Sequence, residues 1–212
     1  MSPQPRLRSG VPRRLVAAAI GAMLLLAACG SDFDPSGPCT SDGKVAGAYP
    51  EMEALVPKAY NGVSPAELDS GRTCTADGLG SLAGHGIKEL RFAGGTWTTG
   101  TQSGLTLATF TSVGGGPDLD PAWLSEFYET TARSAKNIQS IETSEPALGD
   151  GATAHRLDVL NDESYQTVIV WRQGGRVVAV LVGDFIREVQ SKDAHEKIVQ
   201  AAVQTLLGGA PA

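Results

Sequence analysis

Two segments of the chain show hydrophobic residues at helical spacing. From Pro121 to about Lys136, apolar and small side chains recur every three or four positions, and charged residues occupy the other faces. Asp120 precedes this segment and is a suitable N-cap. A second amphipathic pattern runs from about Ser191 to Leu207 and stops at Gly208-Gly209. Both segments are predicted to be helices that turn one face to the core.

Most of the remaining apolar pattern predicts strands. They are expected at Ile87 to Thr98, Leu105 to Thr111, Ile138 to Thr143, Thr153 to Leu160, Tyr165 to Arg172 and Arg176 to Val182. The last two are almost continuously apolar, so both faces should be covered and both strands should lie inside the sheet. Gly94-Gly95 is expected to mark a bulge or bend. Short helical segments are expected around 50–56 and 75–82, with a loop between them.

The order of these elements predicts an α+β fold. A helix, two strands, a helix, several hairpin-linked strands and a final helix suit an antiparallel sheet flanked by helices, as in an α/β/α sandwich. In this outline the chain is similar to the PsbP-like fold found in several small lipoproteins, a resemblance of topology that rests on no sequence motif. With 42% hydrophobic and 19% charged residues, the composition suits a single globular domain, expected at residues 48–208.

The N-terminus has a different pattern. Four arginines within residues 6–14 precede an uncharged run of 14 residues, from Leu15 to Ala28. This is the layout of a signal peptide, and the run is shorter than the roughly 20 apolar residues of a membrane-spanning helix. Leu26-Ala27-Ala28-Cys29 resembles the bacterial lipobox, in which a peptidase cuts before a cysteine whose thiol carries diacylglycerol. An ordinary signal peptide followed by a chance cysteine is the alternative.

The lipobox resemblance implies a location. Residues 1–28 would be removed as a lipoprotein signal peptide, and Cys29 would carry acyl chains such as palmitate. The protein would then lie on the extracytoplasmic face of a membrane in the cell envelope. Residues 29–47 are rich in Gly, Ser, Asp and Pro, so they are expected to form a flexible tether between the lipid and the domain.

Charge and cysteine content fit an exported protein. Without residues 1–28, which hold four of the 17 basic and none of the 23 acidic residues, the formal charge is −10. Such a surface disfavours nucleic acid and anionic lipid head groups as partners. If Cys29 is acylated, Cys39 and Cys74 remain as a pair in an oxidising compartment, and a disulfide is expected. A metal or redox role is the alternative, although the chain has no CxxC motif.

The sequence offers no catalytic motif. It lacks a P-loop, a GxSxG elbow, an HExxH pair and a dinucleotide-binding glycine pattern. His85, His155 and His195 are too scattered along the chain to indicate a metal site. No metal and no cofactor is therefore predicted.

A candidate binding surface is expected at six residues: Trp97, Asn161, Asp162, Glu163, Tyr165 and Trp171. The acidic turn at 161–163 could bind a cation or an amine, although a hairpin turn explains the same residues. The two tryptophans could be exposed anchors for a partner, and core packing is their alternative.

Together these features favour a membrane-anchored, non-catalytic binding or accessory module of the cell envelope. The expected partners are the membrane surface, through the lipid anchor, and an envelope protein or a small apolar ligand, but not nucleic acid. One alternative is a carrier or sensor that binds a small apolar ligand between the sheet and a helix. A hydrolase with an unrecognised active site is another.

Overall fold

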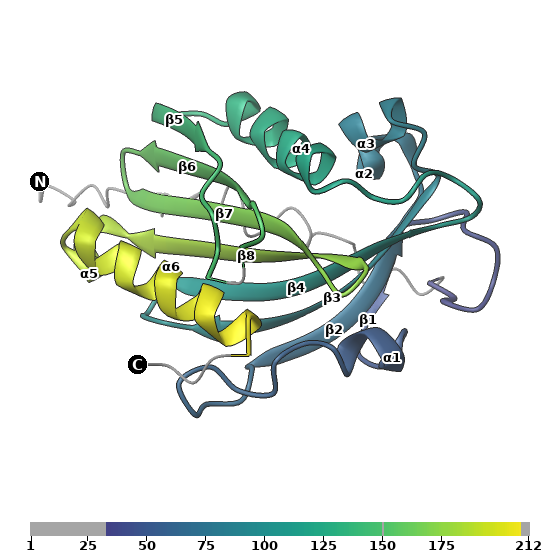
Figure 1. Cartoon of the computed structure of the whole chain (residues 1–212), viewed down its shortest axis with the longest axis horizontal. Helices are drawn as coiled ribbons and strands as arrows, with labels where there is room; N and C mark the ends of the chain where they lie inside the picture. Colours follow the sequence, from purple (N-terminus) through teal and green to yellow (C-terminus); the bar gives the residue numbers. More distant parts are fainter. Residues whose placement is uncertain (1–32, 150, 209–212) are drawn as a thin grey trace, which may run out of the picture.

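The computed structural model describes residues 33–149 and 151–208 (Figure 1). Within these residues the strands form one eight-stranded sheet in the order β1-β2-β3-β4-β8-β7-β6-β5, and each neighbouring pair is antiparallel. The strands are β1 (Gly43–Val45), β2 (Glu67–Thr73), β3 (Glu89–Thr98), β4 (Gly104–Val113), β5 (Ile138–Ser144), β6 (His155–Asn161), β7 (Ser164–Gln173) and β8 (Arg176–Phe185). The predicted α+β class is therefore confirmed.

The helices of the described residues are mostly short. They are α1 (Pro50–Glu53), α2 (Ala76–Leu79), α3 (Ser81–Gly84), α4 (Pro121–Ser134), α5 (Ile186–Val189) and α6 (Lys192–Leu206). The two predicted long helices, α4 and α6, are both present. The Asp120 side chain caps α4 by accepting a hydrogen bond from the backbone N–H of Ala122, at 2.8 Å. In the part of the chain that the structure describes, no helix is both long and apolar enough to cross a membrane.

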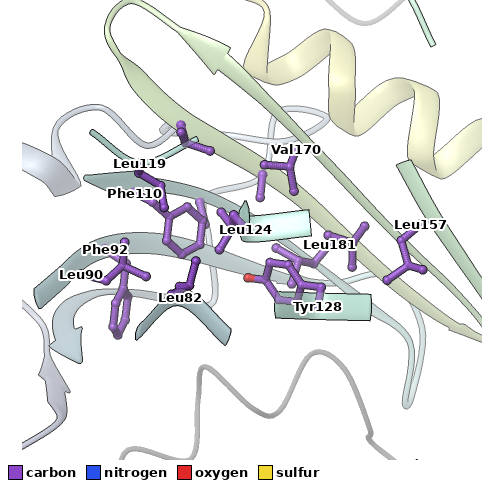
Figure 2. Close-up of a cluster of buried hydrophobic side chains, with 14 of the residues drawn as sticks. Leu82, Leu90, Phe92, Phe110, Leu119, Leu124, Tyr128, Leu157, Val170 and Leu181 are labelled. Carbon is purple, nitrogen blue, oxygen red and sulfur yellow. The ribbon is translucent and has the colours of Figure 1, made fainter. Parts of the chain in front are cut away.

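Alternate residues of the sheet enter two separate hydrophobic clusters. On β8, Val177, Ala179 and Leu181 belong to one cluster, and the residues between them belong to the other. The first cluster includes buried side chains of α2, α3 and α4, and Figure 2 shows part of it. The second includes buried side chains of α1 and α6. Both faces of β8 are thus buried, which explains its almost continuous apolar sequence.

The structure differs from the sequence prediction at one edge of the sheet. β1 lies within the range predicted as a tether, and β2 lies where a loop was expected. β1 pairs with β2 from Gly43 to Val45, so the folded domain begins before residue 48. β2 reads Glu-Leu-Asp-Ser-Gly-Arg-Thr, which lacks the apolar alternation of a half-buried strand.

The bulge expected at Gly94-Gly95 is absent from β3, whose register with β2 and β4 is continuous there. Gly95 is instead close to two buried side chains. A Cβ atom at this position would lie 2.8 Å from the Trp97 ring and 3.0 Å from the Val56 side chain. The glycine therefore leaves room for the large indole to approach the strand closely.

Candidate functional site

The two tryptophans of the predicted binding surface are buried. The exposed fraction is 3% for Trp97 and 0% for Trp171, and both belong to the cluster on the α1 and α6 face. The Nε1 atom of Trp97 donates a hydrogen bond to the Val63 carbonyl oxygen at 2.8 Å. The proposal that either residue is an exposed anchor is wrong, and core packing, the alternative, is what the structure shows.

The polar turn between β6 and β7 is held by hydrogen bonds between the Asn161 side chain and the backbone of the turn. Asn161 Oδ1 accepts hydrogen bonds from the N–H groups of Glu163, at 2.9 Å, and Ser164, at 2.8 Å. Asp162 Oδ1 accepts one from Gln139 Nε2 at 2.9 Å. Asp162 and Glu163 are exposed. The structure brings these residues together as a hairpin turn, and no group of three potential metal ligands occurs among residues 33–149 and 151–208.

Tyr165, the last residue of the predicted surface, leads to a larger polar cluster. Its ring lies 5.7 Å from that of His195 on α6. Around His195, charged and hydroxyl side chains of β6, β7, β8 and α6 form a continuous chain of hydrogen bonds, which we call the α6 network. Its members are Arg156, Asp158, Thr167, Asp184, His195 and Glu196.

His195 joins the helix to two strands. Its Nδ1 atom lies 2.7 Å from Asp184 Oδ2, and its Nε2 atom lies 2.9 Å from Thr167 Oγ1. The Thr167 hydroxyl in turn donates to Asp158 Oδ1 at 2.6 Å. A hydroxyl group has one proton to donate, so Thr167 can only accept from His195. Both ring nitrogens of His195 therefore have a partner within the network.

Arg156 closes the network at its more exposed end. Its guanidinium group donates to Asp158 at 2.7 and 2.9 Å and to Glu196 at 3.1 and 2.6 Å. Burial raises the pKa of Asp158, but the hydrogen bonds from Arg156 and Thr167 outweigh burial and hold it below its ordinary value. The hydrogen bonds of Arg156 likewise lower the pKa of Glu196. Both carboxylates are thereby kept ionised.

Asp184, His195 and Thr167 are spaced like the orienting carboxylate, the base and the hydroxyl nucleophile of a catalytic triad. The resemblance is limited to these distances. Thr167 is only 1% exposed, and His195 and Asp184 are 3% and 0% exposed. The hydroxyl also gives its proton to Asp158 rather than to the imidazole. No substrate carbonyl group could approach this hydroxyl, so the network as it stands fastens α6 to the sheet.

The sequence contained a weak signal for this network. Asp158 lies between Leu157 and Val159, and Thr167 precedes the apolar run 168–171; the structure pairs Asp158 and Thr167 directly across β6 and β7. A carboxylate and a hydroxyl in such positions need partners if they are buried. Sequence spacing could not identify His195 as that partner, because α6 follows β8 and the helix must first fold back onto the sheet.

A second polar cluster fastens the start of the domain to β2. We call it the N-terminal clasp, comprising residues 33–42 and their contacts with Arg72, Cys74 and Thr75. The buried Arg72 guanidinium donates to the carbonyl oxygens of residues 34, 37 and 38 at 2.8, 2.8 and 3.0 Å. Asp42 accepts hydrogen bonds from the backbone N–H groups of Cys74, at 2.7 Å, and Thr75, at 3.0 Å.

A disulfide completes the clasp. The Sγ atoms of Cys39 and Cys74 lie 2.13 Å apart, as predicted from the cysteine count. Residues 33–47 are therefore held against the domain through much of the range predicted as a tether. Cys29 and the predicted signal peptide lie outside the described residues.

No protein-family model matches this chain, and a search of the curated proteins also returns no match. Its function must therefore be argued from its own residues.

Proposed function

We propose that the chain is an exported lipoprotein, held on the extracytoplasmic face of a membrane through acylated Cys29, and that its domain is a non-catalytic binding or accessory module of the cell envelope. The observation that carries this proposal is the N-terminal clasp. Its disulfide suits an oxidising compartment outside the cytoplasm. It also fixes the domain to the segment that follows the lipobox-like Leu26-Ala27-Ala28-Cys29.

The burial of the α6 network supports a non-catalytic role. The densest array of ionisable side chains described above lies between α6 and the sheet, where its groups satisfy one another and where His195, Thr167 and Asp184 are buried. Active sites, in contrast, leave at least one reactive group open to the substrate. The domain would then act by presenting a surface to an envelope protein.

The finer fold assignment belongs to the same proposal. The two hydrophobic clusters, one with α2, α3 and α4 and one with α1 and α6, support an α/β/α sandwich. This arrangement is compatible with the PsbP-like outline expected from the order of the elements. A likeness of topology carries no activity with it.

One observation favours the alternative of a small ligand held between sheet and helix. The Tyr128 hydroxyl on α4 is fully buried and has no hydrogen-bond partner among residues 33–149 and 151–208. Figure 2 shows its ring among apolar side chains that include Leu124 and Leu181. An unpaired buried hydroxyl is unfavourable, and a ligand with an acceptor atom would relieve that cost. Native mass spectrometry of protein extracted in mild detergent would detect such a ligand as added mass.

The anchor is tested by comparing the wild-type protein with Cys29→Ala in bacteria that process lipoproteins. We expect the wild-type N-terminal peptide to begin at Cys29, to carry the mass of acyl chains, and to incorporate labelled palmitate. The Cys29→Ala protein should lose the label and the membrane association. A double Cys39→Ala/Cys74→Ala variant is the matched control, because it removes two cysteines and should keep the label. An unmodified Cys29 in the wild-type protein would contradict the proposal.

The accessory role is tested by crosslinking in intact cells. An envelope protein enriched reproducibly with wild type over Cys29→Ala would support it and identify the partner. If the wild-type and Cys29→Ala proteins capture the same set of proteins, the accessory role loses its support and the ligand-binding alternative gains.

A further inference from the structure

The exposed large hydrophobic residues of the described chain are gathered in one short region. They are Val45, Leu55, Val63 and Leu68, with exposed fractions of 51%, 44%, 63% and 36%. All four lie within residues 45–68, although the described chain covers residues 33–149 and 151–208. We call this set the edge apolar patch. Single exposed apolar residues are common, but their concentration in one segment indicates a contact surface.

The edge apolar patch lies on the α1 side of the sheet. Val45 on β1 pairs with Ser70, so the two side chains share a face, and Leu68 shares it because it is two residues before Ser70. The Ser70 hydroxyl accepts a hydrogen bond from the Tyr49 N–H just before α1, which identifies the face. Leu55 is the second residue after α1, and the Val63 carbonyl oxygen accepts a hydrogen bond from Trp97, which belongs to the cluster on this face. Figure 1 shows α1 beside β1 and β2, on the side of the molecule away from α4.

The N-terminal clasp holds the start of the described chain on this same face. The Phe33 ring lies against Gly43, where an added Cβ atom would clash with it, and its centroid is 5.9 Å from Arg72 Cζ. Gly43 and Arg72 are cross-strand partners on the face that carries α1. The Tyr49 hydroxyl also donates to the Pro35 carbonyl oxygen at 3.3 Å. Phe33 is thus fixed next to α1.

The covalent chain limits how far the domain can lie from the lipid. Only three residues, Gly30 to Asp32, separate Phe33 from Cys29. Four fully extended steps span at most about 14 Å. The sequence alone suggested a tether up to residue 47, which would have let the domain rotate freely. With the clasp closed, the attachment point is close to one face of the domain.

We propose that this face docks on the lipid surface that holds the anchor, with the edge apolar patch turned toward the bilayer. This inference rests on the proposed acylation of Cys29. The anchor supplies the affinity and brings the patch to the bilayer at high effective concentration, so a small patch is sufficient to orient the domain.

The charges of the protein indicate which lipid head groups the edge apolar patch should contact. Glu51 is exposed on α1, Lys58 is the exposed basic residue of the same segment, and the chain without residues 1–28 carries a formal charge of −10. An anionic surface would repel a chain of this net charge. Docking should therefore be strongest on zwitterionic phospholipid and weaker as anionic lipid is added.

The test uses the acylated full-length protein in phosphatidylcholine vesicles. Since Cys29 is acylated and Cys39 and Cys74 are bonded, an introduced cysteine is the free thiol for an environment-sensitive fluorophore. Val63→Cys and Leu55→Cys place the probe on the patch. Thr130→Cys places it on the exposed side of α4 as the matched control. We expect a blue shift at positions 63 and 55, and loss of emission when lipids spin-labelled at the head group are included, with neither effect at position 130.

The outcomes separate this inference from the proposed function. If mass spectrometry finds no acyl chains, the anchor itself fails. If the protein is acylated and vesicle-bound but all three probes respond alike, the anchor stands and the docking inference is overturned. A blue shift at position 63 that is insensitive to the spin-labelled lipid and grows with protein density would assign the face to a second copy of the chain, which also overturns lipid docking.

Discussion

The β7–β8 hairpin and the β1–β2 pair belong to one sheet but are held in different ways. β7 and β8 have ten residues each, and their central segments, 168–171 and 177–182, are entirely buried and apolar. β1 has three residues, and the buried side chains of β2 include Asp69, Ser70 and Arg72. The comparison shows that hydrophobic burial organises the inner strands, whereas paired polar groups and a covalent link hold the edge.

Three contacts of buried polar groups at the edge illustrate this difference. The Lys44 ammonium group pairs with the Asp69 carboxylate at 2.5 Å, and Ser70 Oγ accepts from the Tyr49 N–H at 2.7 Å. Arg72 binds three carbonyl oxygens of the clasp. A buried polar group contributes little when it is paired but costs stability when it is not. The edge is therefore expected to fail when its pairing fails, independently of the core.

The largest effect should come from removing the disulfide. It closes a loop with a sequence separation of 35 residues, for which the chain-entropy relation gives about 4 kcal/mol. The variant Cys39→Ala/Cys74→Ala should lose roughly that free energy of unfolding in urea. Amide hydrogen exchange should show lower protection in β1 and β2 and retained protection in β7 and β8. A loss of less than about 1 kcal/mol would contradict the chain-entropy estimate and mean that the disulfide contributes little to the stability of the edge.

The second prediction compares the same substitution, Leu to Ala, on β8 and on β2. Leu181 on β8 is 6% exposed in the cluster beneath α4, and Leu68 on β2 is 36% exposed. Leu181→Ala should lower the free energy of unfolding by about 3 kcal/mol, through lost burial and an unfilled cavity. Leu68→Ala should cost less than about 1 kcal/mol. Equal costs, measured by urea unfolding, would mean that the edge depends on apolar burial as much as the core does.

The same contrast explains which parts of the fold the sequence could predict. The strands from β3 to β8 and the helices α4 and α6 follow apolar periodicity, and each was anticipated. β1 and β2 were missed because their burial depends on polar partners distant in sequence, such as the pairing of Lys44 with Asp69. A hydropathy pattern contains no information on such partners.

The candidate site shows the same limit. The disulfide could be predicted from the count of cysteines together with the expectation that the chain is exported. The buried positions of Trp97 and Trp171 could not be decided from sequence, because large aromatic residues occur both in cores and at binding surfaces. The α6 network depends on where α6 docks, so the proximity of His195 to Asp184 and Thr167 required the three-dimensional arrangement.

The smallest expected effect is a loss of stability at acid pH, when the Asp42 carboxylate of the N-terminal clasp is protonated. Burial raises the pKa of Asp42, but hydrogen bonds from Thr75 and from the Cys74 N–H outweigh it and hold the pKa below the ordinary value of 3.8. In unfolded chains the carboxylate takes up a proton more readily than in the folded protein. Its contribution to stability is therefore fully present above pH 3.8 and is lost as the pH falls through the lower folded pKa.

Asp42→Asn should isolate this contribution. The Asn protein should be less stable than wild type at neutral pH, and the difference should shrink below pH 3.8, where the wild-type carboxylate begins to be protonated. Thr75→Ser keeps the hydroxyl donor and should retain the wild-type pH profile, whereas Thr75→Val removes that donor and should flatten it. Urea unfolding across this pH range measures all three. A difference between Asp42→Asn and wild type that stays constant into acid would mean that the Asp42 carboxylate contributes no pH-dependent stability, and the edge would then rest on the disulfide and on Arg72.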